Sequence, residues 1–537
     1  MPYTGAIPAE THPLETVATP QTSRWALWPL TSLALAGAAA CQTLPVAPPK
    51  DSVTVPGASL ITIASPEGTL RPPFSFSSED EALLDKVERG AFNFLWMQGS
   101  PDRGIATGMA PDRTSKTTVS VAGVGFQLSG ICVGVERGWI TRDQGRERCE
   151  LILRSLMNQP DNRKAGLFYH FLDAQHAGQP AEAYERCVST IDSALLMSGI
   201  LTASQYFGGD VRIMGDRLFA DADWQFFIAP PDAKDPQIRG FMTLGWKPAE
   251  ATAPTGAGAL LPYGWVDNGD EHRLVTFLGV CAPREAHRVN PAVYYRMRRQ
   301  LGHYKDSGPM VWFPWSGALF TSFFANCWIN YAAMGPDDPT FWGVPQRAHV
   351  DWWENSRRIA AMHKRKAAEN PRQLPGIGKD SWGMTASDID GGYAVPGLFP
   401  EYLHMPGAQE PRDFVQWPIT DDWGDGTVAP YGAGSCIMFD PTGAVAALRH
   451  YRSLEVGSSR PLWNDPDSGG YGFQDAFNVG AKWVAPDCLA IDQGPLLLSI
   501  ENARTGLIWN TFHAHPCVKA GMERLRLHLD HAAPAAR

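Results

Sequence analysis

Apolar positions recur at helical spacing along most of the chain after residue 78. Segments of about 10 to 20 residues place apolar side chains three or four positions apart, the pattern of amphipathic or buried helices. Strand-like alternation is scarce and confined to loops such as Gly166–Leu172. The predicted helices are Glu79–Met97, Val119–Arg137, Arg142–Asn158, Ser189–Phe207, Val211–Ala220, Gly269–Val280, Pro291–Tyr304, Gly317–Met334, His349–Glu369, Pro441–Leu454, Pro486–Arg504 and His515–Leu527.

Long loops rich in Gly, Pro and Trp separate these segments, and no second linker interrupts them. About a dozen helices in one domain of about 450 residues predict an all-α fold. They fit six helical hairpins closed into a toroid, an (α/α)6 barrel with long aromatic-rich loops. The alternative is an irregular all-α array. Because binding and catalytic residues concentrate on loops, we expect the functional site among them.

The N-terminal part of the chain has a different pattern. Trp25–Ala40 is an apolar run of signal-peptide length, and Cys41 follows small residues, as at a bacterial lipoprotein cleavage site. We therefore expect residues 1–41 to be an export signal of lipoprotein type, with Cys41 as the candidate lipid anchor. Residues 42–77, rich in Pro, Ala, Ser and Thr, are the expected linker, and 78–537 the helical domain. The expected location is the periplasm or outer membrane; the alternative is a disordered cytoplasmic tail.

Composition narrows the classes of function. The net charge is −10 and no Lys/Arg run stands out, which argues against nucleic-acid binding. The chain has 19 Trp residues but only 19% charged residues. Most aromatic rings are core residues, and the alternative is a cleft lined with aromatic faces, which suits sugar rings. The nine cysteines show no CxxC or Cys/His metal pattern, so we expect neither metal nor cofactor.

Scattered carboxylates are the chemistry that remains. The chain has no G-x-S-x-G elbow, no phosphate-binding P-loop and no HExxH motif. Glycoside hydrolysis needs little more than two carboxylates at a set separation, together with sugar contacts. The candidate catalytic carboxylates are Asp192, Glu271 and Asp388.

Each of these carboxylates also has a structural interpretation. Ser189–Asp192 and Asn268–Glu271 have the spacing of a helix capping box, and Asp388 lies among Gly turns. A carboxylate in the first turn of a helix also complements the helix dipole. Cap and catalyst therefore both remain open.

Candidate substrate contacts come from the aromatic and Gly-rich loops and from one helix start. They are Asp112, Arg113, His170, Trp315, Trp382, Asp492 and Gln493. Arg113 is equally an ion-pair partner for Asp112, and His170 a core histidine. Trp315 fits a stacking platform and a core position equally well.

Several stretches, in order along the chain, together resemble the bacterial glucoamylase-like domain family, which includes glycoside hydrolase family 144 of the endo-β-1,2-glucanase type. They are GVGFQLSGICVGVERGWITRDQGRER (123–148), GLFYHFLD (166–173), STIDSALLMSGILTASQYFGGD (189–210), DWWENSRRIAAMHKRKAAENP (351–371), SWGMTASDIDGGYA (381–394), DGTVAP (425–430), GFQDAFN (472–478) and CLAIDQGPLLLSIENARTGLIW (488–509). The ordered set spans nearly everything after residue 80.

The resemblance implies an (α/α)6 barrel whose cleft is lined by the N-termini of inner helices. It implies an inverting, metal-free hydrolase of β-linked glucan, most characteristically β-1,2-glucan or its oligosaccharides. Glu271 matches the family's catalytic-cleft Glu and would be the general acid. A family D-x-x-E pair falls on Ser189 and Asp192, so Ser stands for Asp and Asp for Glu. Asp192 is the first candidate for the base and Asp388 the second.

Two other functions stay open at this point. Loss of the family Asp at Ser189 would suit a non-catalytic glycan-binding or envelope lipoprotein on a degenerate hydrolase fold. The family's name would suit an α-1,4-glucan hydrolase of the glucoamylase type. The first predicts binding without turnover of any glucan, the second predicts products from starch, and neither changes the expected fold.

Overall fold

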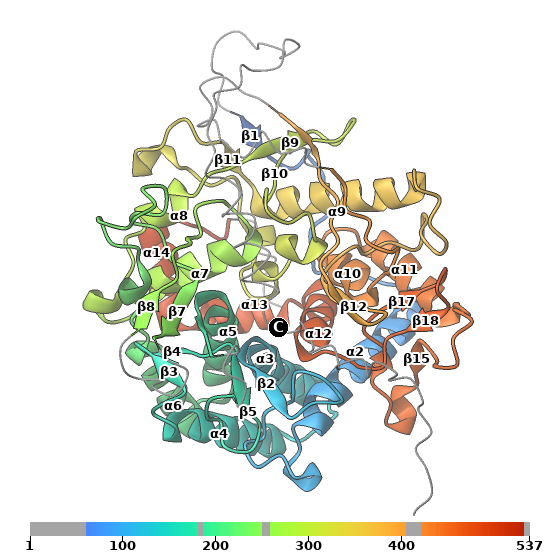
Figure 1. The fold of residues 1–537 in the computed structure, drawn as a ribbon, viewed down its shortest axis with the longest axis horizontal. Helices are drawn as coiled ribbons and strands as arrows, with labels where there is room; N and C mark the ends of the chain where they lie inside the picture. Colours follow the sequence, from blue (N-terminus) through green and yellow to red (C-terminus); the bar gives the residue numbers. More distant parts are fainter. Residues whose placement is uncertain (1–60, 181–185, 250–257, 404–419, 531–537) are drawn as a thin grey trace, which may run out of the picture.

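The computed structural model describes residues 61–180, 186–249, 258–403 and 420–530. Within them the chain is predominantly helical, as predicted, and its strands are short. The helices at the centre of Figure 1 are α3 (Val121–Glu136), α5 (Thr190–Phe207), α7 (Asp270–Cys281), α10 (Pro430–Ser435) and α12 (Ala490–Arg504). The helices around them are α2 (Ser78–Gln98), α4 (Arg142–Asn158), α6 (Gly209–Asp221), α8 (Ala292–Arg296), α9 (Trp352–Glu369), α11 (Pro441–Ser453) and α14 (Pro516–Leu525). Helix α13 (Leu507–Ala514) lies near the middle of that view and contacts α5 and α12.

The central helices are apolar on nearly every side because other helices surround them. In α5, every residue from Thr190 to Ser204 is buried. Helix α3 packs against α5 and α12, α5 packs against α7, and α12 packs against α10. The contact of α3 with α5 depends on glycine, since a Cβ on Gly199 would lie 2.0 Å from the carbonyl oxygen of Gly125. Two glycine-bearing faces therefore let these helices approach closely.

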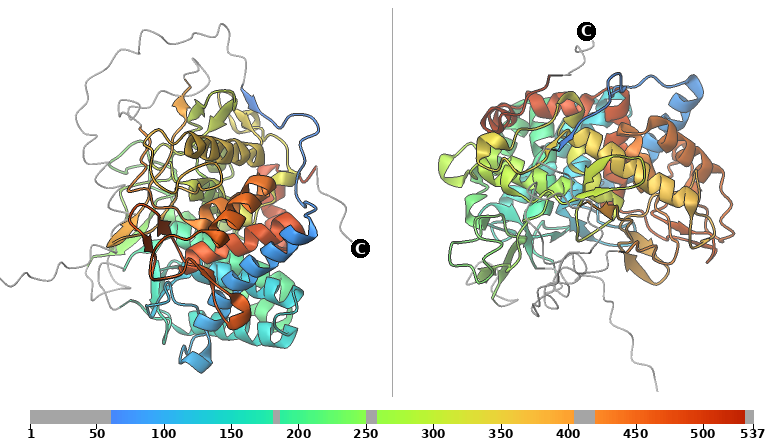
Figure 2. Two further views of the ribbon diagram at one scale, coloured as in Figure 1. Left: turned by 90° about the vertical axis from the view of Figure 1, so that its right-hand side faces the viewer. Right: turned by 90° about the horizontal axis from the view of Figure 1, so that it is seen from above.

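The surrounding helices have one buried and one solvent-facing side. Helix α4 begins with a capping box, with reciprocal hydrogen bonds between Thr141 and Gln144. Figure 2 shows α2 running beside α12, and the two helices are in contact. Outer helices thus cover the apolar central ones.

Two predicted helices are wrong. The segment 317–334 forms separate 3-10 turns, among them Leu319–Ser322 and Ala325–Cys327, because the Asp270 carboxylate accepts the backbone N–H groups of Ala325 and Asn326. Those donors are then lost to an α-helical ladder. The segment 291–304 keeps only α8 and then turns into a strand.

Short strands connect the helices and shape the loops. The pairs are β1 (Thr62–Ile63) with β11 (His349–Val350), β2 (Thr118–Ser120) with β5 (Phe171–Asp173), β3 (Arg163–Lys164) with β4 (Leu167–Phe168), β12 (Ser387–Ile389) with β13 (Gly392–Ala394), β15 (Trp463–Asn464) with β16 (Gly472–Phe473), and β17 (Phe477–Asn478) with β18 (Trp483–Val484). Two sheets have three strands, β10 (Pro309–Val311), β9 (Leu301–His303) and β14 (Glu401–Tyr402), and β6 (Val188–Ser189), β7 (Gly245–Pro248) and β8 (Gly258–Leu260).

The chain packs on the helical body earlier than the sequence predicts. Strand β1 pairs in parallel with β11, and Arg71 bonds to Asp351 at 2.5 Å and lies over the ring of Trp353. Residues 61–77 of the expected linker thus make ionic and packing contacts with the helical body that the composition did not reveal. The expected signal and Cys41 lie outside the described residues. Across the part of the chain that the structure describes, none of the helices combines the length and apolar character of a membrane span.

Candidate active site

Three central helices carry an acidic residue in the first turn. These residues are Asp192 in α5, Glu271 in α7 and Asp492 in α12. The positive end of a helix dipole favours negative charge there. Helix α5 packs against α7, and the Trp265 indole N–H, just before α7, donates to Thr190 Oγ1 at the start of α5, so the two helix starts lie at one site. The charge of Asp192 contributes to the raised pKa of Glu271.

Glu271 is the carboxyl group with the fewest hydrogen bonds at this site. Its side chain is half-buried, and no hydrogen bond from another described residue reaches its carboxyl oxygens. Loss of hydration raises the pKa of Glu271 to about 8, and the negative charges of Asp192 and Asp270 add to the rise. At neutral pH this carboxyl group is therefore mostly protonated, as a proton donor must be.

The neighbouring Asp270 has the opposite character. It is buried, and it accepts hydrogen bonds from Arg273 and from the backbone of Ala325 (2.6 Å) and Asn326 (3.1 Å). This network fixes the first turn of α7. The two adjacent carboxyl groups therefore have different roles. Asp270 holds the start of α7 in place, whereas the Glu271 carboxyl group has no hydrogen bond to a described residue.

Aromatic rings flank the start of α7. Trp265 stacks on His272 with ring centroids 4.4 Å apart, and its indole N–H donates to Thr190 Oγ1 at 3.0 Å. Trp315 is half-buried and donates from its indole N–H to Asp267 Oδ2 at 2.9 Å. Trp265 thereby links α7 to the start of α5. Trp315, predicted as a sugar platform, keeps part of its surface exposed.

Asp192 is both capped and available. The Ser189 hydroxyl accepts the Asp192 backbone N–H at 3.2 Å, so Ser189 is the cap of α5. The Asp192 carboxylate is not used in that cap and faces His170 instead, with Oδ1 3.2 Å from Nε2. Ser189 therefore caps the helix, whereas the Asp192 carboxylate takes no part in the cap and pairs with His170.

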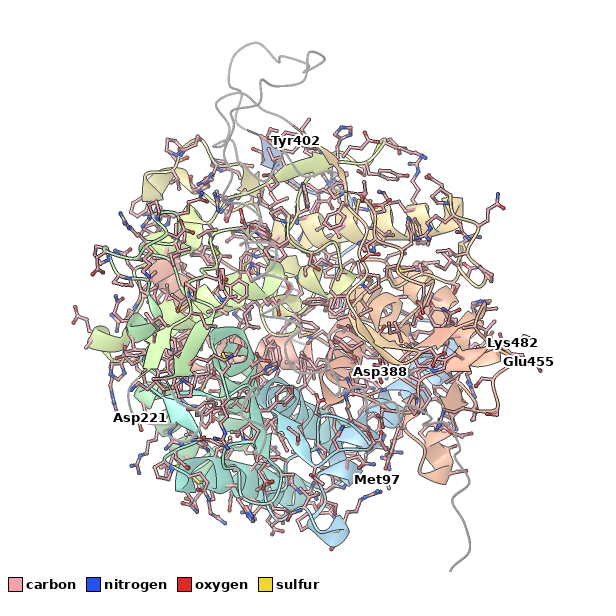
Figure 3. The ribbon with its side chains drawn as sticks, viewed as in Figure 1. Met97, Asp221, Asp388, Tyr402, Glu455 and Lys482 are labelled. Atoms are coloured by element: carbon pink, nitrogen blue, oxygen red, sulfur yellow. The ribbon has the colours of Figure 1, made fainter. Side chains whose placement is uncertain are left out.

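A second acidic cluster surrounds Arg113. Its guanidinium lies 2.5 Å from Asp388 Oδ1 and 3.4 Å from Asp112 Oδ2, and Asp475 accepts the Asp388 backbone N–H at 2.7 Å. Burial raises the pKa of Asp388 to about 7, Asp475 adds to the rise, and Arg113 opposes it. Figure 3 shows Asp388 near the middle of the molecule, whereas Asp221 and Lys482 lie at its periphery. Asp388 is thus poised to change charge near neutral pH.

The structure separates the remaining predicted contacts. Trp382 is 1% exposed, and its ring is part of the core rather than a platform for a sugar. Asp492 and Gln493 are buried, and Gln493 donates to the Phe473 carbonyl at 2.9 Å. Burial and the charge of Asp475 raise the pKa of Asp492 well above its ordinary value. These three residues are therefore part of the buried interior.

Sequence reasoning did not select two residues that the structure places here. Trp265 joins α5 and α7, and Asp475 joins Asp388 to Asp492. Asp475 lies in the stretch GFQDAFN, whose motif was visible, whereas Trp265 carries no signal in its neighbours. Among the described residues no group of three or more His, Cys, Asp or Glu side chains is arranged to hold a metal ion.

Comparison with known proteins gives a consistent set of relatives. Residues 262–516 match the protein family described as "Putative glucoamylase". An exo-β-1,2-glucooligosaccharide sophorohydrolase (non-reducing end) of Parabacteroides distasonis is 27% identical over 484 residues, which cover 84% of this chain. The match covers 59% of that relative's length. The predicted resemblance to the glucoamylase-like family is confirmed.

Solved structures agree with the fold. One described as a putative glucoamylase from Bacteroides uniformis is 27% identical, with a TM-score of 0.66, covering 85% of this chain and 98% of that one. The endo-β-1,2-glucanase of Chitinophaga pinensis, solved with sophorotriose and glucose, is 22% identical, with a TM-score of 0.65, covering 84% and 99%. The second likeness concerns the fold alone. Together the solved structures agree with the predicted helical fold.

Proposed function

We propose that this glucoamylase-like chain is a glycoside hydrolase that cleaves β-linked glucan, most characteristically β-1,2-glucan or its oligosaccharides. The observation that carries the proposal is Glu271, a half-buried carboxyl group with a pKa of about 8 that lies within electrostatic reach of Asp192. Inverting hydrolysis needs one protonated and one ionised carboxyl group and neither metal nor cofactor.

Glu271 is the general acid. Protonation of the leaving oxygen requires a group that still holds its proton near the working pH. Glu271 meets this condition, and no described neighbour occupies its carboxyl oxygens. Its place in the first turn of α7 opens it to a substrate bound across the helix starts.

Asp192 is the first candidate for the carboxylate that orients and deprotonates the attacking water. It is electrostatically coupled to Glu271, and His170 holds its carboxylate. Asp388 is the second candidate, because its pKa of about 7 suits a base and Arg113 fixes its orientation. In an inverting enzyme the acid and base carboxyl groups lie roughly 6.5–9.5 Å apart, which leaves room for the water.

A toroid of six helical hairpins is the architecture that we propose for this site. Helix α10 contacts α12, α12 contacts α3, α3 contacts α5, and α5 contacts α7. This succession of neighbours supports a ring of central helices. The 3-10 turns of residues 319–327 contact α7 and occupy the remaining position. In that arrangement the helix starts bearing Asp192 and Glu271 face a common cleft.

The substrate assignment follows from the aromatic surroundings and from the relatives. Half-exposed Trp315 and Trp265 lie beside α7, where aromatic faces suit sugar rings. The Parabacteroides relative acts on β-1,2-glucooligosaccharides and the Chitinophaga enzyme on β-1,2-glucan. The glucan is thus the proposed partner of this chain, and we further propose export with lipid attachment at Cys41.

The test is to incubate the purified protein with β-1,2-glucan, β-1,3-glucan, β-1,4-glucan and starch and to measure new reducing ends. We expect products from the β-1,2-glucan, with the anomeric configuration inverted in freshly released sugar, read by proton NMR. Tight binding without turnover of any glucan would instead indicate a glycan-binding protein. Products from starch alone would indicate the α-1,4 specificity.

A further inference from the structure

His170 lies between the starts of two central helices. Its backbone N–H donates to the Cys187 carbonyl at 2.8 Å, just before α5, and its own carbonyl accepts the Val121 N–H at 3.1 Å, at the start of α3. These bonds fix the backbone of His170 to both helices. Its side chain therefore emerges at a defined place beside Asp192.

The imidazole ring is held on more than one side. It stacks on Phe171 with ring centroids 4.0 Å apart and an interplanar angle of 21°. Its Nε2 lies 3.2 Å from Asp192 Oδ1. The Asp192 backbone is itself fixed by the Ser189 cap. Both partners of the His170–Asp192 contact are thus immobilised before any substrate arrives.

Asp112 completes the surroundings of the ring. The charges of Asp112 and His170 act on each other, and Asp112 also lies 3.4 Å from the Arg113 guanidinium, which holds Asp388. The order of groups is Asp192, His170, Asp112, Arg113, Asp388. This series of alternating acidic and basic side chains runs from Asp192 to Asp388, the two candidate base carboxylates.

We propose that His170 is a positioning residue that fixes the orientation of the Asp192 carboxylate. The proposal rests on the proposed hydrolase function for its kinetic consequence, but its structural part does not. A contact of the imidazole with Asp192 Oδ1 would hold the carboxylate in place and leave Oδ2 for the attacking water. His170 itself then needs no contact with the sugar.

The structural part is tested without any activity measurement. In ¹⁵N-labelled protein we expect an imidazole N–H signal from His170 Nε2 that moves on Asp192→Asn and stays in place on Asp388→Asn. A His170 signal that is insensitive to Asp192→Asn would overturn the proposal. This outcome is independent of whether any glucan is cleaved.

The kinetic part uses two variants and a control. His170→Phe keeps the stacked ring but loses the N–H donor, so kcat should fall about tenfold to a hundredfold with KM changed less than about twofold. His170→Gln, which retains an N–H, should recover part of kcat, and Phe171→Leu, which keeps the imidazole, should lose less than His170→Phe.

A different split would contradict the proposal. If His170→Phe raises KM at unchanged kcat and pH profile, His170 is a sugar contact instead. If the wild-type protein cleaves no glucan while the His170 signal responds to Asp192→Asn, the hydrolase function fails and the positioning contact stands.

Discussion

The adjacent residues Asp270 and Glu271 show how one helix start assigns two roles to two carboxyl groups. Asp270 is buried in an ion pair with Arg273 and accepts two backbone N–H groups, whereas no described residue bonds to the Glu271 carboxyl group. The same helix dipole acts on both. Their difference comes from tertiary contacts, chiefly the 3-10 turns that meet Asp270.

The substitution Asp270→Asn should therefore destabilise the fold. It leaves the buried Arg273 without its charge partner, and breaking a buried pair in this way costs about 3–5 kcal/mol. Urea unfolding followed by circular dichroism measures the change. Glu271→Gln is the matched control next to it, and an equal loss in both variants would contradict the division of roles.

The raised pKa of Glu271 predicts a stability difference that depends on pH. Because the folded-state pKa of about 8 lies above the ordinary 4.5, the folded protein binds this proton more tightly than the unfolded chain. The stabilisation is complete below about pH 4.5 and is lost as pH rises through 8. Relative to wild type, Glu271→Gln should gain stability between pH 5 and 9, measured by thermal unfolding across that range. No gain would mean that Glu271 is hydrated normally.

The two base candidates predict different acidic limbs of the pH–rate profile. If Asp388 is the base, activity falls as pH drops through about 7 because its carboxyl group becomes protonated, and Asp388→Asn removes that limb. If Asp192 is the base, Asp192→Asn removes the limb instead. Profiles of kcat for both variants decide between them, and a limb that persists in both excludes both.

At the scale of elements, the cap of α5 has its own energetic signature. Ser189 accepts the Asp192 N–H, and removing such a cap costs about 0.5–2 kcal/mol. We expect Ser189→Ala to lose about this much in urea unfolding. Ser189→Asp should retain the cap, because an Asp side chain accepts the same N–H. Equal stability of Ser189→Ala and wild type would show that the cap contributes nothing.

The helices that the sequence predicted well are those whose pattern is decided locally. The segment 142–158 was predicted without error, because its capping box and its amphipathic face both lie within it. The segment 317–334 failed because a carboxylate distant in sequence, Asp270, takes its N–H groups. Periodicity contains no information about such a contact.

The same limit applies to the site. Helix starts bearing Asp192 and Glu271 were identifiable from the sequence, but their proximity depends on the packing of α5 against α7. Trp382 was a candidate sugar contact and is 1% exposed, and its backbone is bonded to the Tyr451 hydroxyl of α11. Loop packing decides which aromatic ring stays exposed to solvent, and the pattern of residue types does not specify that packing.

On the scale of the whole molecule, the end of α12 away from the site is held by charge. Arg504 bonds to Glu88 of α2 at 2.5 Å, and Arg137 of α3 bonds to Glu501 of α12 at 2.8 Å. These pairs join α2, α3 and α12. Ion pairs thus hold these helices together at the end of α12 opposite Asp492.

The proposed mechanism also predicts that metal removal has no effect. Prolonged treatment with a chelator, followed by dialysis, should leave both glucan cleavage and thermal stability unchanged, because two carboxyl groups supply the chemistry. The control is readdition of divalent cations, which should give no gain. A chelator-sensitive rate restored by one metal would contradict the metal-free mechanism.

The most direct test of the central claim, that Glu271 is the general acid, is the rate of Glu271→Gln on two substrates. On β-1,2-glucan, whose leaving sugar oxygen needs a proton, kcat should fall about 10²–10⁴-fold. On an aryl β-sophoroside with a dinitrophenolate leaving group, which departs without protonation, the loss should be much smaller. An equal loss on both substrates, or wild-type activity on the glucan, would contradict the assignment of Glu271 as the acid.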